Sequence, residues 1–247
     1  MKNNSALIFG LRPIKEAIDS GKQLDKLFIQ KNIEQSTFNE LKGLAKENKI
    51  PYSIVPLQKL NSLTKKNHQG VVAFISPITY ANLDFLLPSI FEKGKTPLLL
   101  ILDNVSDVRN FGAIARTAEC SGVDAIIIPT RGAAQINEDA VKTSAGALFK
   151  IPVCRVSFLL TTVNILKKSG FSIVSCSEKA DKDIYSANLQ LPTAVILGSE
   201  ESGVSEELLE VSDSIIKIPM KGEIKSLNVS VACGIILFEA RRQQINS

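Results

Sequence analysis

The chain has 247 residues, of which 45% are hydrophobic and 22% charged, as in ordinary globular proteins. This length is enough for one large domain or two smaller ones with real cores. The formal net charge of +4 permits a nucleic-acid partner without requiring one, so function has to be argued from motifs.

Cysteine and histidine usage argues against a metal site. None of the four cysteines has CxxC spacing, and His68 is the only histidine in the sequence. No apolar run is long enough for a signal peptide or a membrane span. We therefore expect a cytoplasmic protein with reduced thiols, no metal and no membrane partner.

The N-terminal part predicts a small α/β domain. Phe38, Leu41 and Ala45 recur at helical spacing, and short apolar runs on either side predict strands. Proline and glycine then punctuate a stretch that holds one helix. We expect a first domain over 1–78, a linker over 79–96 and a second domain over 97–247. The predicted helices of the first domain are 12–19, 38–48 and 57–63, and its predicted strands are 27–30, 51–55 and 70–76.

In the second domain, predicted strands and helices alternate. Several strands are near-continuous apolar runs, which is typical of parallel strands covered on both faces. The pattern predicts an α/β fold with a doubly wound parallel sheet. The predicted strands are 98–102, 125–128, 152–156, 172–175, 194–197 and 215–218. The predicted helices are 111–120, 138–148, 159–168, 205–211 and 227–243.

Three of these strands end in small, amide or charged residues. The segments are ILDNVSDVRNFGAIARTAECSG at 101–122, AVILGSEESGVS at 194–205 and IPMKGEIKSLNVSVACGIILFEARRQ at 218–243. Ligands of open α/β sheets bind where strand ends pass into loops and helix N-termini. The three turns therefore predict one site. Ser226 is expected to be the N-cap of the last helix.

Several enzyme classes lack their motifs here. The sequence GSEESG has no Lys-Ser/Thr pair after its last glycine, so it is not a Walker A loop. A GxGxxG fingerprint after a first strand is absent, which argues against a Rossmann dinucleotide site. A GxSxG elbow is absent too, and His68 falls in the other predicted domain, so a serine hydrolase has little support.

Together the three segments resemble the three motifs of the SpoU (TrmH) family of RNA ribose 2′-O-methyltransferases, in the SPOUT superfamily. The resemblance covers about residues 97–243 and implies S-adenosylmethionine as cofactor, a C-terminal trefoil knot and a homodimer. The blocks GLRPIKEAI and NHQGVVAFIS resemble the RNA-binding substrate domain of a subset of this family. This arrangement points to the RlmB subgroup, which methylates a guanosine ribose in the peptidyl-transferase region of 23S rRNA.

The resemblance also implies roles for individual residues. A segment with Ser144 and Gly146 resembles one that lines the site, although a tight helix contact explains it nearly as well. The implied catalytic residues are Asn110, Arg116, Glu200, Ser226 and Asn228. The implied cofactor-binding residues are Leu197, Gly198, Ile218, Met220, Ser226, Leu227 and Asn228. The expected RNA-binding residues are Arg12, Lys15, Lys65, Lys66 and Arg109. For the lysines, a solvated charged face is the alternative.

Arg116 follows Asn110 by six residues, as in the family pattern NxGxxxR. Arginine is a poor base because its pKa exceeds about 12, so we favour a role in clamping a phosphate beside the target ribose. The alternative is a surface arginine paired with Glu119 or Asp107. Glu200 is expected to orient Asn110 or Arg116, and the alternative is a carboxylate that only stabilises a helix N-terminus.

Two departures from the family pattern concern loop geometry. Val108 and Arg109 stand where the family often has proline and a small or polar residue, and Glu201 stands where it often has glycine. Two rival functions stay open: a tRNA ribose methyltransferase, and a non-catalytic RNA-binding or ribosome-assembly protein of the same fold. The predicted last helix is apolar on more than one face, so we expect it to contact the second subunit of a dimer.

Overall fold

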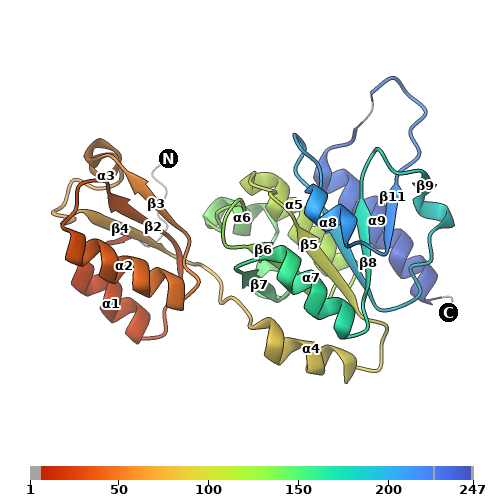
Figure 1. Cartoon of the computed structure of the whole chain (residues 1–247), viewed down its shortest axis with the longest axis horizontal. Coiled ribbons are helices and arrows are strands. Elements are labelled where there is room, and N and C mark those ends of the chain that lie inside the picture. The colour runs from red at the N-terminus through yellow and green to blue at the C-terminus, as the bar shows by residue number, and fades with distance from the viewer. Residues whose placement is uncertain (1–6, 225, 246–247) are drawn as a thin grey trace. The chain divides into compact units, whose positions relative to one another are not determined.

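The structure is a computed structural model that describes residues 7–224 and 226–245 (Figure 1). The chain divides into two compact units, residues 1–79 with 135–138 and residues 80–134 with 139–247. The stretch after residue 79 is part of the second unit, where helix α4 (Leu83–Phe91) contributes Leu83, Leu87 and Ile90 to the core. None of the described helices is long and apolar enough to cross a membrane.

The first unit is a four-stranded mixed sheet with helices on both faces. The strand order is β1-β4-β2-β3, in which β2 and β3 are parallel and the other pairs antiparallel. Helices α1 and α2 pack over one face through Ile14 and Leu41, and α3 packs over the other through Leu60. The strands are β1 (Leu7–Phe9), β2 (Leu24–Gln30), β3 (Tyr52–Val55) and β4 (Val71–Ile75); the helices are α1 (Leu11–Asp19), α2 (Gln35–Glu47) and α3 (Leu57–Leu63).

The second unit is built on a seven-stranded parallel sheet of order β7-β6-β5-β10-β8-β11-β9. This confirms the predicted parallel α/β sheet. Helices α4, α7 and α8 cover one face, and α5 and α9 lie together on the other (Figure 1). The strands are β5 (Leu98–Leu102), β6 (Ala125–Pro129), β7 (Val153–Val156), β8 (Ser172–Cys176), β9 (Lys182–Asp183), β10 (Thr193–Leu197) and β11 (Ser214–Lys217). The remaining helices are α5 (Val108–Cys120), α6 (Glu138–Thr143), α7 (Leu159–Lys168), α8 (Glu206–Glu210) and α9 (Val229–Ile245).

Several predicted helices were wrong at their ends. Helices α2 and α5 each begin three residues before the predicted start, at Gln35 and Val108. The helix predicted over 138–148 stops at Thr143, because Ala145 and Gly146 have positive φ angles of 50° and 85°. Helices α5 and α6 approach each other closely at this end: a Cβ on Gly112 would lie 2.7 Å from the Cβ of Thr143. The last helix begins at Val229, two residues later than predicted.

The N-cap of α9 is Asn228 and not Ser226. The Asn228 Oδ1 atom accepts a hydrogen bond from the backbone N–H of Ser230 at 2.9 Å, which is the bond expected of a capping side chain. The prediction of Ser226 was therefore wrong by two residues. Ser226 instead lies in the loop that leads into the helix.

Asp213, which precedes β11, gives the fold a pH-dependent contact. Its carboxylate accepts a hydrogen bond from Ile173 N at 2.8 Å and pairs with Lys167 Nζ at 2.8 Å. Burial acts to raise the pKa of Asp213, but the hydrogen bonds from Lys167 and Ile173 and the charge of Lys167 outweigh it, so the pKa is lowered. A carboxyl with a lowered folded-state pKa stabilises the fold above its unfolded pKa of about 3.9, and this stabilisation is lost as the pH falls through the folded pKa.

We expect Asp213→Asn to lower the free energy of unfolding at pH 7 by about 0.5–1 kcal/mol, as for a solvent-screened ion pair. The difference from wild type should shrink as the pH falls below about 4, because the wild-type carboxyl is then protonated too. Urea unfolding of both proteins at pH 7 and at lower pH measures the difference in the free energy of unfolding at each pH. Glu210→Gln on the neighbouring helix α8 is the control and should change neither. A constant Asp213→Asn difference across this pH range would contradict the prediction.

Candidate functional site

A cavity of about 280 Å³ opens at the carboxyl ends of β8, β10 and β11. Its volume is close to the lower end of the range for small-molecule sites, and its place is where ligands of open α/β sheets bind. Leu197, Ile216 and Ile236 give it apolar walls, and the loops that follow the strands give it a polar rim. Six of the seven predicted cofactor-binding residues line it: Leu197, Gly198, Ile218, Met220, Ser226 and Leu227.

The loop that follows β10 is a tight turn held by its own backbone. Gly203 N donates to Ser199 O at 2.9 Å, and the Ser199 Oγ atom accepts from Ser202 N at 3.1 Å. A Cβ on Gly198 would overlap the backbone of Gly203 and Val204, so no other residue type fits at this position. At Gly198 the turn therefore packs backbone directly against backbone, and any side chain there would force the turn apart.

Asn110, Glu200 and Asn228 form a hydrogen-bonded group, here called the amide–carboxylate cluster. The Glu200 Oε1 atom accepts from Asn110 Nδ2 at 3.1 Å, from Asn228 Nδ2 at 2.6 Å and from Val229 N at 3.2 Å. Asn228 Nδ2 also donates to Asn110 Oδ1 at 3.0 Å. Residues from all three sequence segments thus meet beside the cavity, and Asn228 belongs to this group rather than to the cavity lining.

The Arg116 side chain is exposed on α5 and makes no hydrogen bond or ion pair within residues 7–224 and 226–245. The alternative of a paired surface arginine was wrong: Glu119 pairs with Lys150 at 3.7 Å, and Asp107 accepts from Asn110 N at 2.7 Å. Six residues along a helix correspond to about 9 Å and about 120° around the axis, so Arg116 does not share a face with Asn110. The guanidinium is available to a group from outside the described part of the chain.

Helix α9 packs along α5 and leaves an apolar strip open. The Arg241 Nε atom donates to Ser121 O at 2.8 Å and fastens the end of α9 to the end of α5. On the outer side of α9, Val231 is 51% exposed and Phe238 is 53% exposed. These two residues are seven positions apart and so lie on the same face of the helix. About half of each of these two side chains is therefore open to contact with another molecule.

The five predicted RNA-binding residues differ in the groups that they contact in the structure. Arg12 pairs with Glu16 at 2.9 Å and Lys15 pairs with Glu40, so both charges are partly neutralised. Lys65 and Lys66 lie exposed on the loop between α3 and β4, and Lys66 Nζ lies 5.8 Å from the ring centroid of Phe9. Arg109 is exposed in the first turn of α5, in the second unit.

Two cysteines lie at or below the cavity. Burial raises the pKa of Cys233 to about 12, and burial together with Cys233 raises the pKa of Cys176 as well. Both thiols are therefore protonated at neutral pH and are poor nucleophiles. In the described part of the chain, no three His, Cys, Asp or Glu side chains are grouped so that they could hold a metal ion.

The sequence reasoning missed one segment of the cavity, the loop of Ser177, Glu178 and Lys179 after β8. No motif marks it. The signal that could have identified it is the parallel sheet itself, because β8 ends at the same edge as β10 and β11.

Two family models match the chain. Residues 97–238 match the model described as the SpoU rRNA Methylase family, and residues 7–81 match the one described as RNA 2′-O ribose methyltransferase substrate binding. A protein of Staphylococcus saprophyticus, assigned by name to the TrmH family of tRNA/rRNA methyltransferases, is 38% identical over 238 residues, which are 96% of each chain.

Solved structures are similar over the same regions. The SpoU methyltransferase AviRb from Streptomyces viridochromogenes, in complex with the cofactor AdoMet (S-adenosylmethionine), is 26% identical with a TM-score of 0.62, over 98% of this chain and 91% of that one. The A. aeolicus TrmH/SpoU tRNA modifying enzyme is 32% identical with a TM-score of 0.57, over 66% of this chain and 85% of that one.

Proposed function

The chain belongs to the SpoU family of rRNA methylases, and from this premise we propose that it methylates the ribose 2′-hydroxyl of a guanosine in 23S rRNA. It is an S-adenosylmethionine-dependent RNA 2′-O-ribose methyltransferase. Besides 23S rRNA as the substrate, we propose that the chain belongs to the RlmB subgroup, that its C-terminal part forms a trefoil knot and that the protein is cytoplasmic.

The cavity beside β10 and β11 fits the cofactor by its chemistry. Apolar Leu197 and Leu227 suit the faces of an adenine ring, and the bare backbone of the Gly198 turn suits its hydrogen-bonding edge. The absence of a side chain at Gly198 lets the turn close against Gly203 and Val204, which sets the position of the backbone at the cavity rim. S-adenosylmethionine, when bound, supplies an electrophilic methyl group.

The amide–carboxylate cluster carries the proposal, because it joins the three sequence segments beside the cavity. Its hydrogen bonds hold the loops that orient the ribose, which satisfies the positioning that methyl transfer requires. The Arg116 guanidinium cannot take the proton of the 2′-hydroxyl, because it stays protonated. We assign to Arg116 the clamping of a phosphate next to that ribose.

The position of Arg116 supports the proposal of a dimer. Within one subunit, Arg116 and the amide–carboxylate cluster lie on different faces of α5, so a complete site requires the arginine of a second copy. The open strip of Val231 and Phe238 lies on α9, the helix packed against α5, and can bury itself against the same strip of that copy. The proposed assembly is therefore a homodimer with two composite sites.

The preference for rRNA over tRNA rests on the N-terminal unit. Residues 7–81 match a substrate-binding model. The similarity to the A. aeolicus tRNA modifying enzyme, in contrast, extends over only 66% of the chain. The test is transfer of labelled methyl from S-adenosylmethionine to unmethylated 23S rRNA transcript and to bulk tRNA. Label in a guanosine ribose of the rRNA is the expected result. Label only in tRNA would overturn the substrate and keep the chemistry.

For the N-terminal unit, we expect the double variant Lys65→Ala/Lys66→Ala to raise the KM for rRNA by about tenfold with little change in kcat. Each lysine that contacts a phosphate also contributes about one unit to the slope of log affinity against log salt, so that slope should fall by about two. Filter binding at several salt concentrations measures the slope. Lys42→Ala/Lys46→Ala, on the exposed side of α2, is the matched control. Equal effects of the two pairs would contradict a specific role for the loop.

A further inference from the structure

A second cavity, also of about 280 Å³, lies at the carboxyl ends of β5, β6 and β7. None of the residues assigned a role above lines it. Asp103 and Asn104 form one side, Arg131 and Phe158 form the side contributed by the loops after β6 and β7, and Glu207 of α8 completes it. The cavity thus combines a cation, an aromatic ring and hydrogen-bonding groups.

The floor of this cavity is held in place by buried hydrogen bonds. The Asp103 carboxylate is buried and accepts from Ser205 N at 2.7 Å and from Asn104 Nδ2 at 2.8 Å. Asn104 has a positive φ of 56°, a conformation that an asparagine keeps only where its surroundings stabilise it. Thr130 N donates to Val156 O at 2.8 Å and joins the ends of β6 and β7. The cavity is therefore preformed.

The two cavities lie on opposite sides of the loop 198–205 and helix α8. Leu197, the loop after it and Leu209 border the cofactor cavity, whereas Glu207 borders the second cavity. Ser205 N and Leu197 O are both hydrogen-bonded to Asp103 at the floor of the second cavity. The strands β5, β6 and β7 follow β10 in the sheet, so β7 lies roughly 14 Å from β10 at the usual strand spacing. An RNA that presents a ribose at the first cavity can reach the second with a neighbouring nucleotide.

Phe158 and Arg131 give the second cavity the chemistry of a nucleotide site. Phe158 is 73% exposed, although its carbonyl accepts from Thr162 N at 3.2 Å and from Thr162 Oγ1 at 2.9 Å, which fixes its backbone. Arg131 is exposed and has no ion pair or hydrogen bond in the described part of the chain. Proteins bind single-stranded RNA by stacking bases on aromatic rings and by placing cations at phosphates. The Glu207 carboxylate can accept from a base amino group or a ribose hydroxyl.

Resting on the proposed methyltransferase function, we propose that the second cavity binds an RNA nucleotide that flanks the methylated one. Its base stacks on Phe158 and its phosphate contacts Arg131. The subsite contributes to the choice of RNA sequence or shape around the target and does not take part in methyl transfer.

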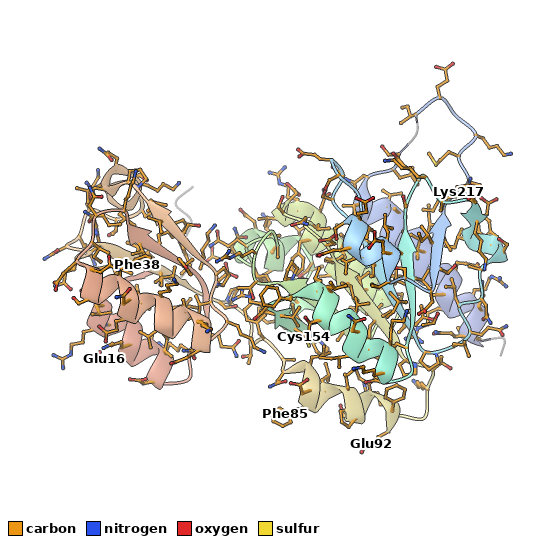
Figure 2. All side chains as sticks on the ribbon, in the orientation of Figure 1. Glu16, Phe38, Phe85, Glu92, Cys154 and Lys217 are labelled. Atoms are coloured by element: carbon orange, nitrogen blue, oxygen red, sulfur yellow. The ribbon has the colours of Figure 1, made fainter. Side chains whose placement is uncertain are left out.

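The chain has no tryptophan, which allows a direct test. Phe158→Trp places the single tryptophan of that variant at the cavity. Phe85→Trp places it on α4, where Phe85 is 81% exposed and lines neither cavity (Figure 2). Unmethylated 23S rRNA transcript is expected to quench the fluorescence of Phe158→Trp and to leave that of Phe85→Trp unchanged, because a stacked base quenches an indole. Equal quenching of the two variants would overturn the subsite.

Kinetics separate the subsite from the methyltransferase function itself. Phe158→Ala is expected to raise the KM for rRNA about tenfold with kcat nearly unchanged, Phe158→Tyr to restore the wild-type KM, and Phe85→Ala to have no effect. Wild-type KM in Phe158→Ala, with methyl transfer intact, would overturn the subsite alone. A wild-type chain that neither binds nor methylates RNA would overturn the proposed function and the subsite together.

Discussion

Arg116→Ala is expected to lower kcat for RNA methylation by about 10²- to 10³-fold, the effect of removing a charge contact that serves the transition state. Cofactor affinity should stay at the wild-type value, because Arg116 does not line the cofactor cavity. Arg116→Lys should recover only part of the rate, because an ammonium keeps the charge but cannot make the bidentate hydrogen bonds of a guanidinium to a phosphate. Single-turnover transfer and calorimetric titration of S-adenosylmethionine measure the two quantities.

Arg109→Ala is the matched control for this variant. Arg109 is exposed on the same helix, and as an RNA-binding residue it should alter the KM for RNA and leave kcat unchanged. If Arg116→Ala changed the KM and kept the wild-type kcat, Arg116 would be one more RNA-binding residue, and the assigned role would be wrong.

Mixing two inactive variants tests whether Arg116 acts across a dimer. An Arg116→Ala subunit keeps its cofactor cavity. A Gly198→Ala subunit keeps its arginine but loses the cofactor, because the added Cβ overlaps the backbone of Gly203 and Val204. In a mixed dimer, one of the two composite sites then has both parts. After unfolding and refolding the variants together, activity should return to about a quarter of the wild-type rate, because half of the dimers are mixed. No recovery, with dimers present by light scattering, would place Arg116 in the site of its own subunit.

The sheet and the position of the site could be predicted from the sequence because they depend on short-range patterns. The apolar run Leu98–Leu102 is buried along its whole length, as its composition indicates for a parallel strand. Polar residues after β5, β10 and β11 indicated one shared edge, since all parallel strands end on the same side. Strands such as β1 and β9 were missed because three or two residues are too few to show a period.

The contact of Glu200 with Asn110 was expected from the family resemblance, but other pairings of side chains could not be predicted from the sequence. Ser226 and Asn228 are both good N-cap residues, and the choice between them depends on Glu200 and Asn110, which position Asn228 from 28 and 118 residues away. Lys15 has the sequence context of a free cation, yet Glu40 on the next helix pairs with it. Local patterns indicate which chemical groups are present, and the fold determines which groups meet.

Gly198→Ala is expected to lower the affinity for S-adenosylmethionine by at least about 100-fold. The added Cβ would overlap backbone atoms of Gly203 and Val204, which cannot rotate away as a side chain can. The turn must open, and its opening shifts Leu197 and the backbone groups at the cavity edge. Overpacking of this kind also costs about 1–3 kcal/mol of stability, so the melting temperature should fall by several degrees.

Two other glycines provide a graded comparison in the same region. Gly222, in the loop after β11, has no atom within 4 Å of an added Cβ, so Gly222→Ala should bind the cofactor like wild type. Gly203 also has free space but a φ of 68°, so Gly203→Ala should show an intermediate loss from backbone strain of about 1 kcal/mol. Calorimetric titration of S-adenosylmethionine into the three folded variants measures the order of their affinities. Gly203→Ala strains the same turn without a steric overlap, so it tests the role of the turn even if Gly198→Ala fails to fold. Unchanged cofactor affinity in both Gly203→Ala and Gly222→Ala would show that the turn does not form the cofactor site.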